Sequence, residues 1–246
     1  MNAHDVYSQS LLGGVEKFIK HYWDKLEIPS EMLPHHKKVL EIGSGFGYTA
    51  RDIKLQYDNY VTASDVSDES IKIFTDLKIK QEIDDFLKLD IVEDTIDKKS
   101  DLYDKFEFVM IYEVLEHVSS PYHALSNIKN ICVNEGYVHI SIPDFDHQFG
   151  YTGHQHAFVY PGLFIPKYFE AFLNQMYFKI VFYRPFVHAH TSSFIENLYT
   201  KVKRYDKALH HYYVCQNIKS IDNQDILDVV NSNNDMTEIY KKLMNT

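Results

Sequence analysis

The fold is decided by the stretch Val39-Leu40-Glu41-Ile42-Gly43-Ser44-Gly45-Phe46-Gly47, in which an apolar run enters a glycine-spaced turn. The run from 38 to 42 predicts a buried parallel strand, and the residues from 46 to 55 predict a helix. Glycines between a strand and a helix let the backbone approach a ligand closely, because glycine has no Cβ and tolerates positive φ. The stretch therefore predicts an α/β fold with a ligand site at this turn.

Two adenosine cofactors bind at turns of this kind, and the spacing of the glycines separates them. A dinucleotide site has Gly-x-Gly-x-x-Gly, whose third glycine allows close packing of helix and strand. Here Tyr48 stands at that third position, and the glycines run Gly-x-Gly-x-Gly. The carboxylate of Glu41 also favours an ammonium or sulfonium over a pyrophosphate. The turn therefore favours S-adenosylmethionine over NAD.

Composition limits the classes to which the chain can belong. Its 246 residues are 45% hydrophobic and 15% aromatic, which is enough for a sizeable core. The formal net charge of -10 argues against a nucleic-acid partner. Cys132 and Cys215 form no C-x-x-C motif, so neither a structural zinc site nor a disulfide framework is predicted. No apolar run approaches the ~18 residues of a membrane span, and the N-terminus lacks the features of a signal peptide. We therefore expect a cytoplasmic protein with no membrane contact.

Strand and helix patterns alternate along the chain, which predicts a mostly parallel sheet with helices on both faces. Beyond the first strand and helix, the expected strands are 60–65, 85–90, 106–112, 136–142, 179–183 and 211–215, and the expected helices are 67–77, 121–133 and 161–176. We expect a helical cap over 1–36, the main domain over 37–220 and a helical extension over 221–246. The helical spacing in the extension could instead support a homodimer.

Three of the expected strands end in an acidic residue: Glu41, Asp65 and Asp90. The carboxyl ends of parallel strands meet at one edge of the sheet, where ligands bind. Asp65 stands about twenty positions beyond the glycine turn, where a carboxylate accepts hydrogen bonds from ribose hydroxyls. Asp90 could accept a hydrogen bond from the adenine amine. The alternative is that each acid caps the next helix, but three acids in order behind a glycine turn favour a cofactor site.

Jointly these motifs resemble class I S-adenosylmethionine-dependent methyltransferases. The resemblance covers residues 37 to about 185 and rests on 39–47, Ala63-Ser-Asp-Val-Ser67, Leu89-Asp90, Tyr112-Glu-Val-Leu-Glu-His-Val118 and Gly136-Tyr-Val-His-Ile-Ser-Ile-Pro143. It implies a Rossmann-like sheet of seven strands whose last strand is antiparallel. That arrangement would place residues 211–217 beside 178–184.

The resemblance also implies the residues that contact the cofactor. Glycines would approach its methionyl part, acids would bind its amino end, ribose and adenine, and neighbouring side chains would line the site. In chain order these residues are Glu41, Gly43, Gly45, Asp65, Val66, Asp90, Ile91 and Tyr112. Asp65 is shorter than the glutamate common at its place, which implies looser or water-mediated contacts to the ribose.

Methyl transfer is an in-line displacement at a sulfonium carbon, so the protein must orient the acceptor and remove its proton. Two histidine-rich stretches, 113–117 and 144–156, fall at the carboxyl edge of the predicted sheet. Among them His156 is the first choice as general base and His117 the second, and His147 is a third candidate. Loops at a sheet edge commonly determine specificity. We therefore expect residues 145–160 to form a wall or lid.

A narrower resemblance concerns a metal ion. Glu-x-x-Glu-His followed by His-x-Phe resembles the metal-dependent 2′-O-methyltransferases that act on small-RNA 3′ ends. It implies that Glu113, Glu116, His117 and His156 bind a divalent magnesium, manganese or iron ion. The alternative is structural, because Leu-Glu-His-Val is widespread in methyltransferases that use no metal. In those proteins the histidine packs beneath the cofactor or binds the loop.

The expected acceptor is a small hydroxylated molecule, such as a sugar or a nucleotide-linked sugar, that is methylated on oxygen. The polar stretch from 145 to 160, rich in histidine and tyrosine, favours it over an apolar acceptor. The alternatives are an RNA or protein acceptor, the nitrogen of a small amine, and a silent methyltransferase fold that serves as a binding partner. The acidic composition argues against RNA. The glycine turn with Asp65 and Asp90 argues against the silent fold.

Overall fold

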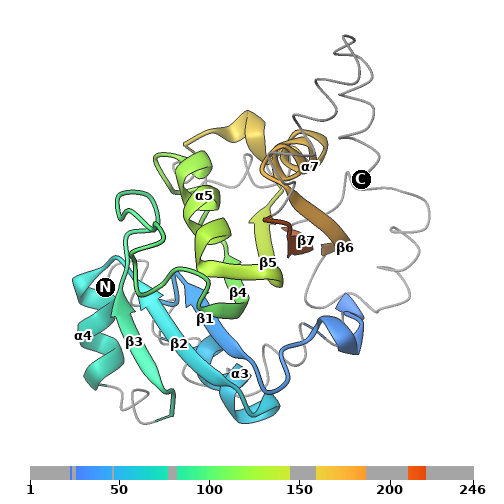
Figure 1. The fold of residues 1–246 in the computed structure, drawn as a ribbon. Coiled ribbons are helices and arrows are strands. Elements are labelled where there is room, and N and C mark those ends of the chain that lie inside the picture. The colour runs from blue at the N-terminus through green and yellow to red at the C-terminus, as the bar shows by residue number, and fades with distance from the viewer. Residues whose placement is uncertain are drawn as a thin grey trace.

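A computed structural model describes residues 23, 26–45, 47–76, 82–144, 159–186 and 210–219. In this part the strands form one sheet in the order β3-β2-β1-β4-β5-β7-β6 (Figure 1). The elements in chain order are η2 (Ser30–Met32), β1 (Lys38–Ile42), α3 (Tyr48–Tyr57), β2 (Tyr60–Asp65), α4 (Asp68–Asp76), β3 (Asp85–Lys88), β4 (Phe106–Tyr112), α5 (Pro121–Ile131), β5 (Cys132–Pro143), η4 (Pro161–Phe164), α7 (Pro166–Gln175), β6 (Phe178–Phe186) and β7 (His210–Asn217).

The direction of β7 sets it apart from the other strands of the described sheet. It lies between β5 and β6 and pairs antiparallel with both, whereas β1 to β5 pair in parallel. The Rossmann-like sheet with one antiparallel strand is thereby confirmed. Because β7 runs the other way, its first residue lies where its neighbours end. His210 stands opposite Pro143 of β5 and Phe186 of β6.

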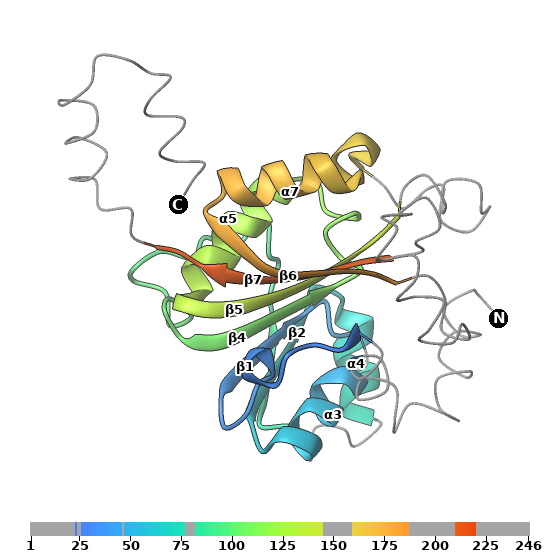
Figure 2. The ribbon, with the colours of Figure 1, turned by 90° about the vertical axis from the view of Figure 1, so that its right-hand side faces the viewer.

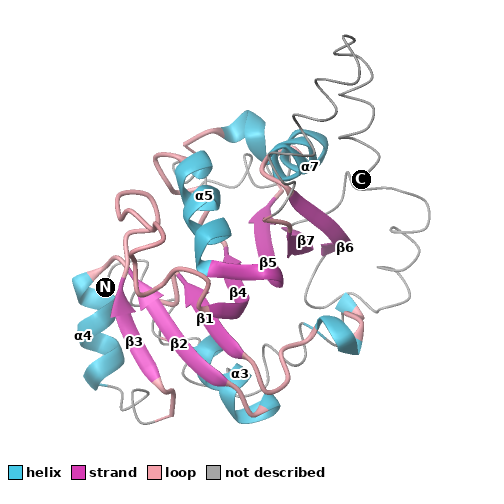
Figure 3. Ribbon diagram, in the orientation of Figure 1, coloured by secondary structure: helices cyan, strands magenta, loops and turns pink. Residues whose placement is uncertain are grey.

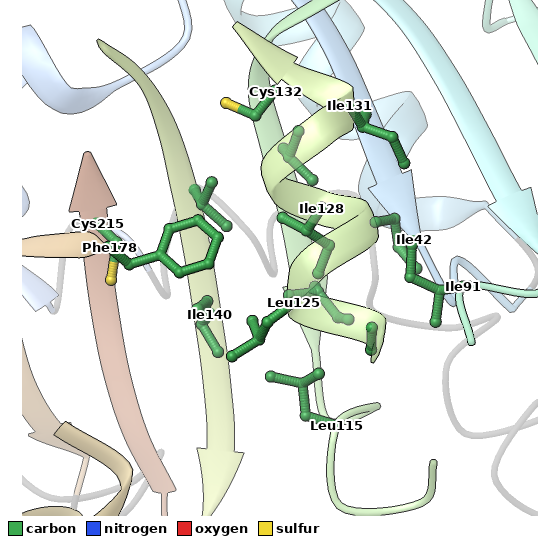
Figure 4. Packing of buried hydrophobic residues seen from close by; sticks show 14 of the residues in the cluster. Ile42, Ile91, Leu115, Leu125, Ile128, Ile131, Cys132, Ile140, Phe178 and Cys215 are labelled. Atoms are coloured by element: carbon green, nitrogen blue, oxygen red, sulfur yellow. The ribbon is translucent and has the colours of Figure 1, made fainter. Parts of the chain in front are cut away.

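Helices cover both faces of the sheet, as the alternating pattern predicts (Figures 2 and 3). Helices α5 and α7 lie on one face, and α3 and α4 lie on the other. On the first face, Leu125 and Ile128 of α5 pack in one core cluster with Ile42 and Ile140 of the strands (Figure 4). On the second face, the buried Trp23 packs in a separate cluster with Phe108 and other strand residues. The described helices include none that is long and apolar enough to cross a membrane.

Proline determines where two helices begin. Helix α5 starts at Pro121, and the hydroxyl of Ser120 accepts a hydrogen bond of 3.3 Å from the amide of His123. The single helix expected over 161–176 is wrong, because the structure has the 3-10 helix η4 followed by α7. Ile165 between them is extended, with φ -78° and ψ 127°. The ring of Pro166 disfavours the α conformation at the residue before it, which separates the two helices.

Two strand boundaries also differ from expectation. Strand β3 ends at Lys88 rather than at residue 90, because the carboxylate of Asp90 accepts hydrogen bonds from the amides of Val92 and Glu93 and begins a turn. Strand β5 begins at Cys132, directly after α5, rather than at residue 136. The other expected strands, and the helices expected over 46–55, 67–77 and 121–133, are present with small differences at their ends. Most of the expected cap over 1–36 and all of the expected extension over 221–246 lie outside the described residues.

Candidate active site

The glycine turn after β1 has the backbone conformation that its sequence predicts. Gly43 and Gly45 have φ of 69° and 53°. A Cβ on Gly43 would lie 2.4 Å from Cγ2 of Val114, so residue 114 packs directly on the turn. At Gly45 no atom lies within 4 Å of such a Cβ among the described residues, so the space above this residue is open. The turn therefore combines a glycine whose Cβ position is taken by Val114 with one whose Cβ position is free of described atoms.

Asp65 ends β2 beside this turn and is mostly buried. Its Oδ2 accepts a hydrogen bond of 2.8 Å from the amide of Gly45, and its Oδ1 accepts one of 2.8 Å from the amide of Ser67. The carboxylate thus joins the glycine turn to the start of α4. The next side chain, Val66, is exposed, which leaves an apolar surface beside the carboxylate.

Glu41 lies beneath the turn and is 5% exposed. Burial raises the pKa of Glu41 to about 8, although hydrogen bonds from the amide of Ala50 and the hydroxyl of Thr49 favour the ionised form. Its Oε2 is buried and has no hydrogen-bond partner among the described residues. A buried carboxylate oxygen in this state suits a cationic ligand group, because a nearby positive charge favours ionisation. The site therefore fits the ammonium of a methionyl ligand.

Asp90 and Ile91 form the start of the turn after β3. The side chain of Ile91 lies in the core rather than on the site surface. Asn127 of α5 holds the turn through hydrogen bonds from Nδ2 to the carbonyls of Ile91 and Asp94, 2.8 and 2.7 Å long. Asn127 was not among the residues predicted from the sequence. The sequence feature that could have identified Asn127 is its position as a polar residue on the apolar face of the helix expected over 121–133.

Tyr112 ends β4 and belongs to a buried chain of hydrogen bonds. Its hydroxyl lies 2.9 Å from that of Tyr212, which contacts Nδ1 of His139, and Nε2 of His139 lies 2.9 Å from the carbonyl of Met32. Burial lowers the pKa of His139 to about 3, so its ring is neutral. Because a carbonyl can only accept, Nε2 carries the proton and Nδ1 accepts from Tyr212. The hydroxyl of Tyr112 therefore donates to Tyr212.

The segment after β4 is not helical, so Glu113 and His117 do not share one face of a helix. Glu113 has φ of 53°, a left-handed conformation that breaks the helix, and residues 114–117 form a turn. Glu116 is buried, and its Oε1 lies 3.5 Å from Nε2 of His117. Burial, followed by the charge of Glu113, raises the pKa of Glu116 to about 9.

Glu113 turns toward two residues that the sequence analysis missed. Its Oε1 accepts a hydrogen bond of 2.7 Å from the hydroxyl of Ser141, and its Oε2 lies 3.0 Å from Nδ1 of His210. Burial by itself lowers the pKa of His210, but the hydrogen bond and charge of Glu113 and the charge of Asp144 outweigh it and raise this pKa. His210 was detectable in principle, because the first residue of an antiparallel strand lies at the carboxyl edge of its parallel neighbours.

A second imidazole–carboxylate pair lies beside the first and is buried. Nε2 of His211 is 2.7 Å from Oδ2 of Asp144, and its Nδ1 is 2.9 Å from the hydroxyl of Tyr183. This pair joins the end of β5 to β6 and β7. His147 and His156 follow Asp144 in the chain and lie outside the described residues. The amide of Val159 donates to the carbonyl of Glu116 at 2.9 Å, so Asp144 and Val159 both lie at this edge.

The described residues contain no group of three or more histidine, cysteine, aspartate or glutamate side chains that could hold a metal ion. Of the four expected ligands, Glu116 and His117 are adjacent. Glu113 instead contacts Ser141 and His210, and His156 is outside the described part. The described geometry therefore gives the metal site no support.

Comparison with known families finds one model that matches residues 15–200, and its description is "Methyltransferase domain". No curated protein matches the chain in sequence. Solved structures match over most of the chain, at sequence identities that speak for the fold alone.

Three such structures come from different organisms. A SAM-dependent methyltransferase from Archaeoglobus fulgidus has a TM-score of 0.61 and 15% identity, over 87% of this chain and 100% of that one. A protein of Haloferax volcanii, solved in complex with the Trm112 methyltransferase activator, has a TM-score of 0.57 and 16% identity, over 84% and 93%. A possible histamine N-methyltransferase from Thermotoga maritima has a TM-score of 0.57 and 14% identity, over 87% and 95%.

Proposed function

Because the chain belongs to the methyltransferase domain family and is an S-adenosylmethionine-dependent enzyme, we propose that it methylates an oxygen of a small hydroxylated acceptor, such as a sugar or a nucleotide-linked sugar. The observation that carries the acceptor class is the contact of Glu113 with His210 at the carboxyl edge of the sheet. Partly exposed hydrogen-bonding groups at this edge suit a hydroxyl-bearing acceptor better than an apolar one.

The donor would bind along the edge formed by β1, β2, β3 and β4. In this proposal Glu41 holds the ammonium, and the backbone of Gly43 and Gly45 lies against the methionyl part. Tyr112 lines that part. Asp65 binds the ribose with Val66 beside it, and the turn of Asp90 and Ile91 binds the adenine. The hydrogen bond from Gly45 to Asp65 supports this assignment, because the glycine turn and the carboxylate of Asp65 are in contact.

When bound, the donor supplies a methyl group on a positively charged sulfur, and the chain must orient an acceptor against it and take up a proton. His156, His117 and His147 remain our predictions for groups on the acceptor side. His117 supports this in part, since it lies in the turn that follows β4 and its side chain is half exposed.

A metal-assisted version of this reaction would require Glu113, Glu116, His117 and His156 to gather around one ion. The contacts of Glu113 with Ser141 and His210 favour the version without a metal. Metal analysis of the purified protein, with methyl transfer measured before and after chelation, separates the two. Activity that is lost to the chelator and restored by one divalent ion would establish the metal-assisted version.

A small amine is the second candidate acceptor. Glu113 and Asp144 place two carboxylates near His210, and such groups attract an ammonium. The Thermotoga maritima neighbour is named as a possible histamine N-methyltransferase, which concerns that protein. RNA or protein as acceptor has less support, because the chain is acidic.

An acceptor screen tests the proposed function. Purified protein is incubated with S-adenosylmethionine and a panel of sugars, nucleotide-linked sugars, phenols and amines, and the release of S-adenosylhomocysteine is measured. We expect turnover with a hydroxylated member of the panel and an O-methyl product by mass spectrometry. Turnover confined to amines would replace oxygen by nitrogen as the methylated atom.

A further inference from the structure

Glu113 and His210 form a side-chain pair from distant parts of the chain. They are 97 residues apart in sequence, and Oε2 of Glu113 lies 3.0 Å from Nδ1 of His210. The second oxygen of Glu113 accepts a hydrogen bond of 2.7 Å from Ser141, which holds the carboxylate in one orientation. The side chains of Glu113 and His210 are 35% and 31% exposed, so both reach the surface at the carboxyl edge.

The contact determines which ring nitrogen of His210 bears the proton. A carboxylate can only accept, so Nδ1 donates to Glu113 and the lone pair of the neutral ring lies on Nε2. The adjacent pair of His211 and Asp144 differs in exposure, because the side chain of His211 is 0% exposed. Of these two pairs, the one that contains His210 is therefore the one that an acceptor can reach.

The pair also lies next to the turn that would hold the donor. Glu113 directly precedes Val114, whose Cγ2 is 2.4 Å from the position of a Cβ on Gly43. The amide of Glu113 donates to the carbonyl of Ser141 at 3.1 Å, which joins this position to β5. His210 begins β7, opposite the last residue of β5. The pair thus stands between the glycine turn and the far strands of the sheet.

We propose that Nε2 of His210 accepts the proton of the acceptor hydroxyl and that Glu113 is its positioning residue. This inference rests on the proposed function. The acceptor oxygen forms a bond to the methyl carbon while the carbon–sulfur bond breaks, and the electron pair of that bond stays on sulfur as a neutral thioether. The hydroxyl proton passes to Nε2. The resulting imidazolium is stabilised by the carboxylate of Glu113 and returns its proton to water after the product leaves.

Sinefungin can test whether Glu113 and His210 face the methyl position of the donor, and this test needs no known acceptor. In this analogue of S-adenosylmethionine an amino-bearing carbon replaces the methyl-bearing sulfur, so its ammonium occupies the place of the methyl group. S-adenosylhomocysteine lacks any group there. Calorimetry gives the ratio of the two affinities, and this ratio reports the residues that face the methyl position. If the pair faces this position, the wild-type protein should bind sinefungin more tightly than S-adenosylhomocysteine.

The variants Glu113→Gln and His210→Asn should each lower the affinity ratio by about fivefold or more, because each removes part of a charge-assisted contact. Their affinity for S-adenosylhomocysteine should stay within about threefold of wild type. Matched controls are Glu107→Gln, which lies at the other end of β4 and contacts Lys37, and the exposed His36→Gln. Both controls should leave the ratio unchanged.

The outcomes separate this inference from the proposed function. If the wild-type protein binds neither compound, the proposed function fails. If it binds S-adenosylhomocysteine but the ratio is the same in both variants, the proposed function stands and the role of His210 is wrong. Loss of S-adenosylhomocysteine binding in both variants would also overturn the inference. The pair would then be needed to bind the donor itself, rather than only to face its methyl position. If only one variant loses S-adenosylhomocysteine binding, the affinity ratio measured in the other variant decides the role of the pair.

Discussion

The amide of Gly45 donates a hydrogen bond of 2.8 Å to Oδ2 of Asp65, and this contact joins the turn after β1 to the end of β2. The same carboxylate accepts from the amide of Ser67 through its other oxygen. A neutral amide in its place would keep one acceptor oxygen and lose the charge and the second acceptor. Asp65 therefore shapes the glycine turn, and its charge is what the proposed contact with the ribose would use.

Asp65→Asn should weaken the binding of S-adenosylhomocysteine by about tenfold or more, since charge-assisted hydrogen bonds are lost. Isothermal titration calorimetry measures the effect. Asp68→Asn is the matched control, because Asp68 is an exposed carboxylate three residues further on that pairs with Lys88. Equal affinity in the Asp65 variant and the control would refute the assignment of Asp65 to the cofactor site.

Binding of S-adenosylhomocysteine should release a proton from Glu41. Burial raises the pKa of this carboxyl to about 8, so the free protein holds it mostly protonated at pH 6.5. The ligand ammonium favours the ionised form, so about one proton should leave at pH 6.5 and about half a proton at pH 8. Affinity should therefore rise between these pH values. Calorimetry in buffers of different ionisation enthalpy measures the release, and Glu41→Gln should abolish it.

The same raised pKa of Glu41 affects stability in the absence of ligand. As the pH rises from 4.5 toward 8, the unfolded chain loses this proton first, so the free energy of unfolding should fall over this range. Glu41→Gln should reduce the fall, which chemical denaturation at several pH values can measure. An equal pH dependence in wild type and variant would contradict the burial of Glu41.

Gly43→Ala should lower the free energy of unfolding by about 2–4 kcal/mol, because the new Cβ meets Val114 and φ is positive. The double variant with Val114→Ala should regain the part due to the steric clash and keep about 1 kcal/mol of backbone strain. Gly162→Ala is the control, since no described atom lies within 4 Å of its Cβ position, and it should change stability by less than about 0.5 kcal/mol. Equal effects at both glycines would contradict the packing.

Tyr212→Phe should destabilise the protein by about 1–3 kcal/mol, because His139 loses its donor and Tyr112 loses its acceptor. Thermal unfolding near neutral pH measures this cost. Tyr122→Phe removes an exposed hydroxyl instead and should leave the unfolding temperature unchanged. A similar loss in both variants would argue against the buried chain of hydrogen bonds.

Local features of the fold were predictable from sequence because their causes are local. The glycine turn, the strand ending at Asp65 and the hydroxyl of Ser67 at the start of α4 each depend on a few neighbouring residues. The break of the helix at Pro166 was predictable too, but the apolar spacing from 161 to 176 concealed it.

The acceptor side could not be predicted in the same way. The contact of Glu113 with His210 depends on the insertion of β7 between β5 and β6, and hydrophobic patterns do not specify the order of strands. The left-handed conformation of Glu113 has no sequence signal either, because glutamate is not a residue that favours positive φ. The roles of His147 and His156 remain predictions.

The late position of β7 in the chain separates the two halves of the site in time during synthesis. The residues proposed to hold the donor are all made by the time the ribosome reaches residue 112, whereas His210 follows almost one hundred residues later. The residues proposed for the donor are thus synthesised well before the residue proposed to take the acceptor's proton. Truncation after β6 would remove Tyr212, the partner of Tyr112, together with His210, and would take away the strand between β5 and β6, so loss of the chain's end would affect the donor side as well as transfer.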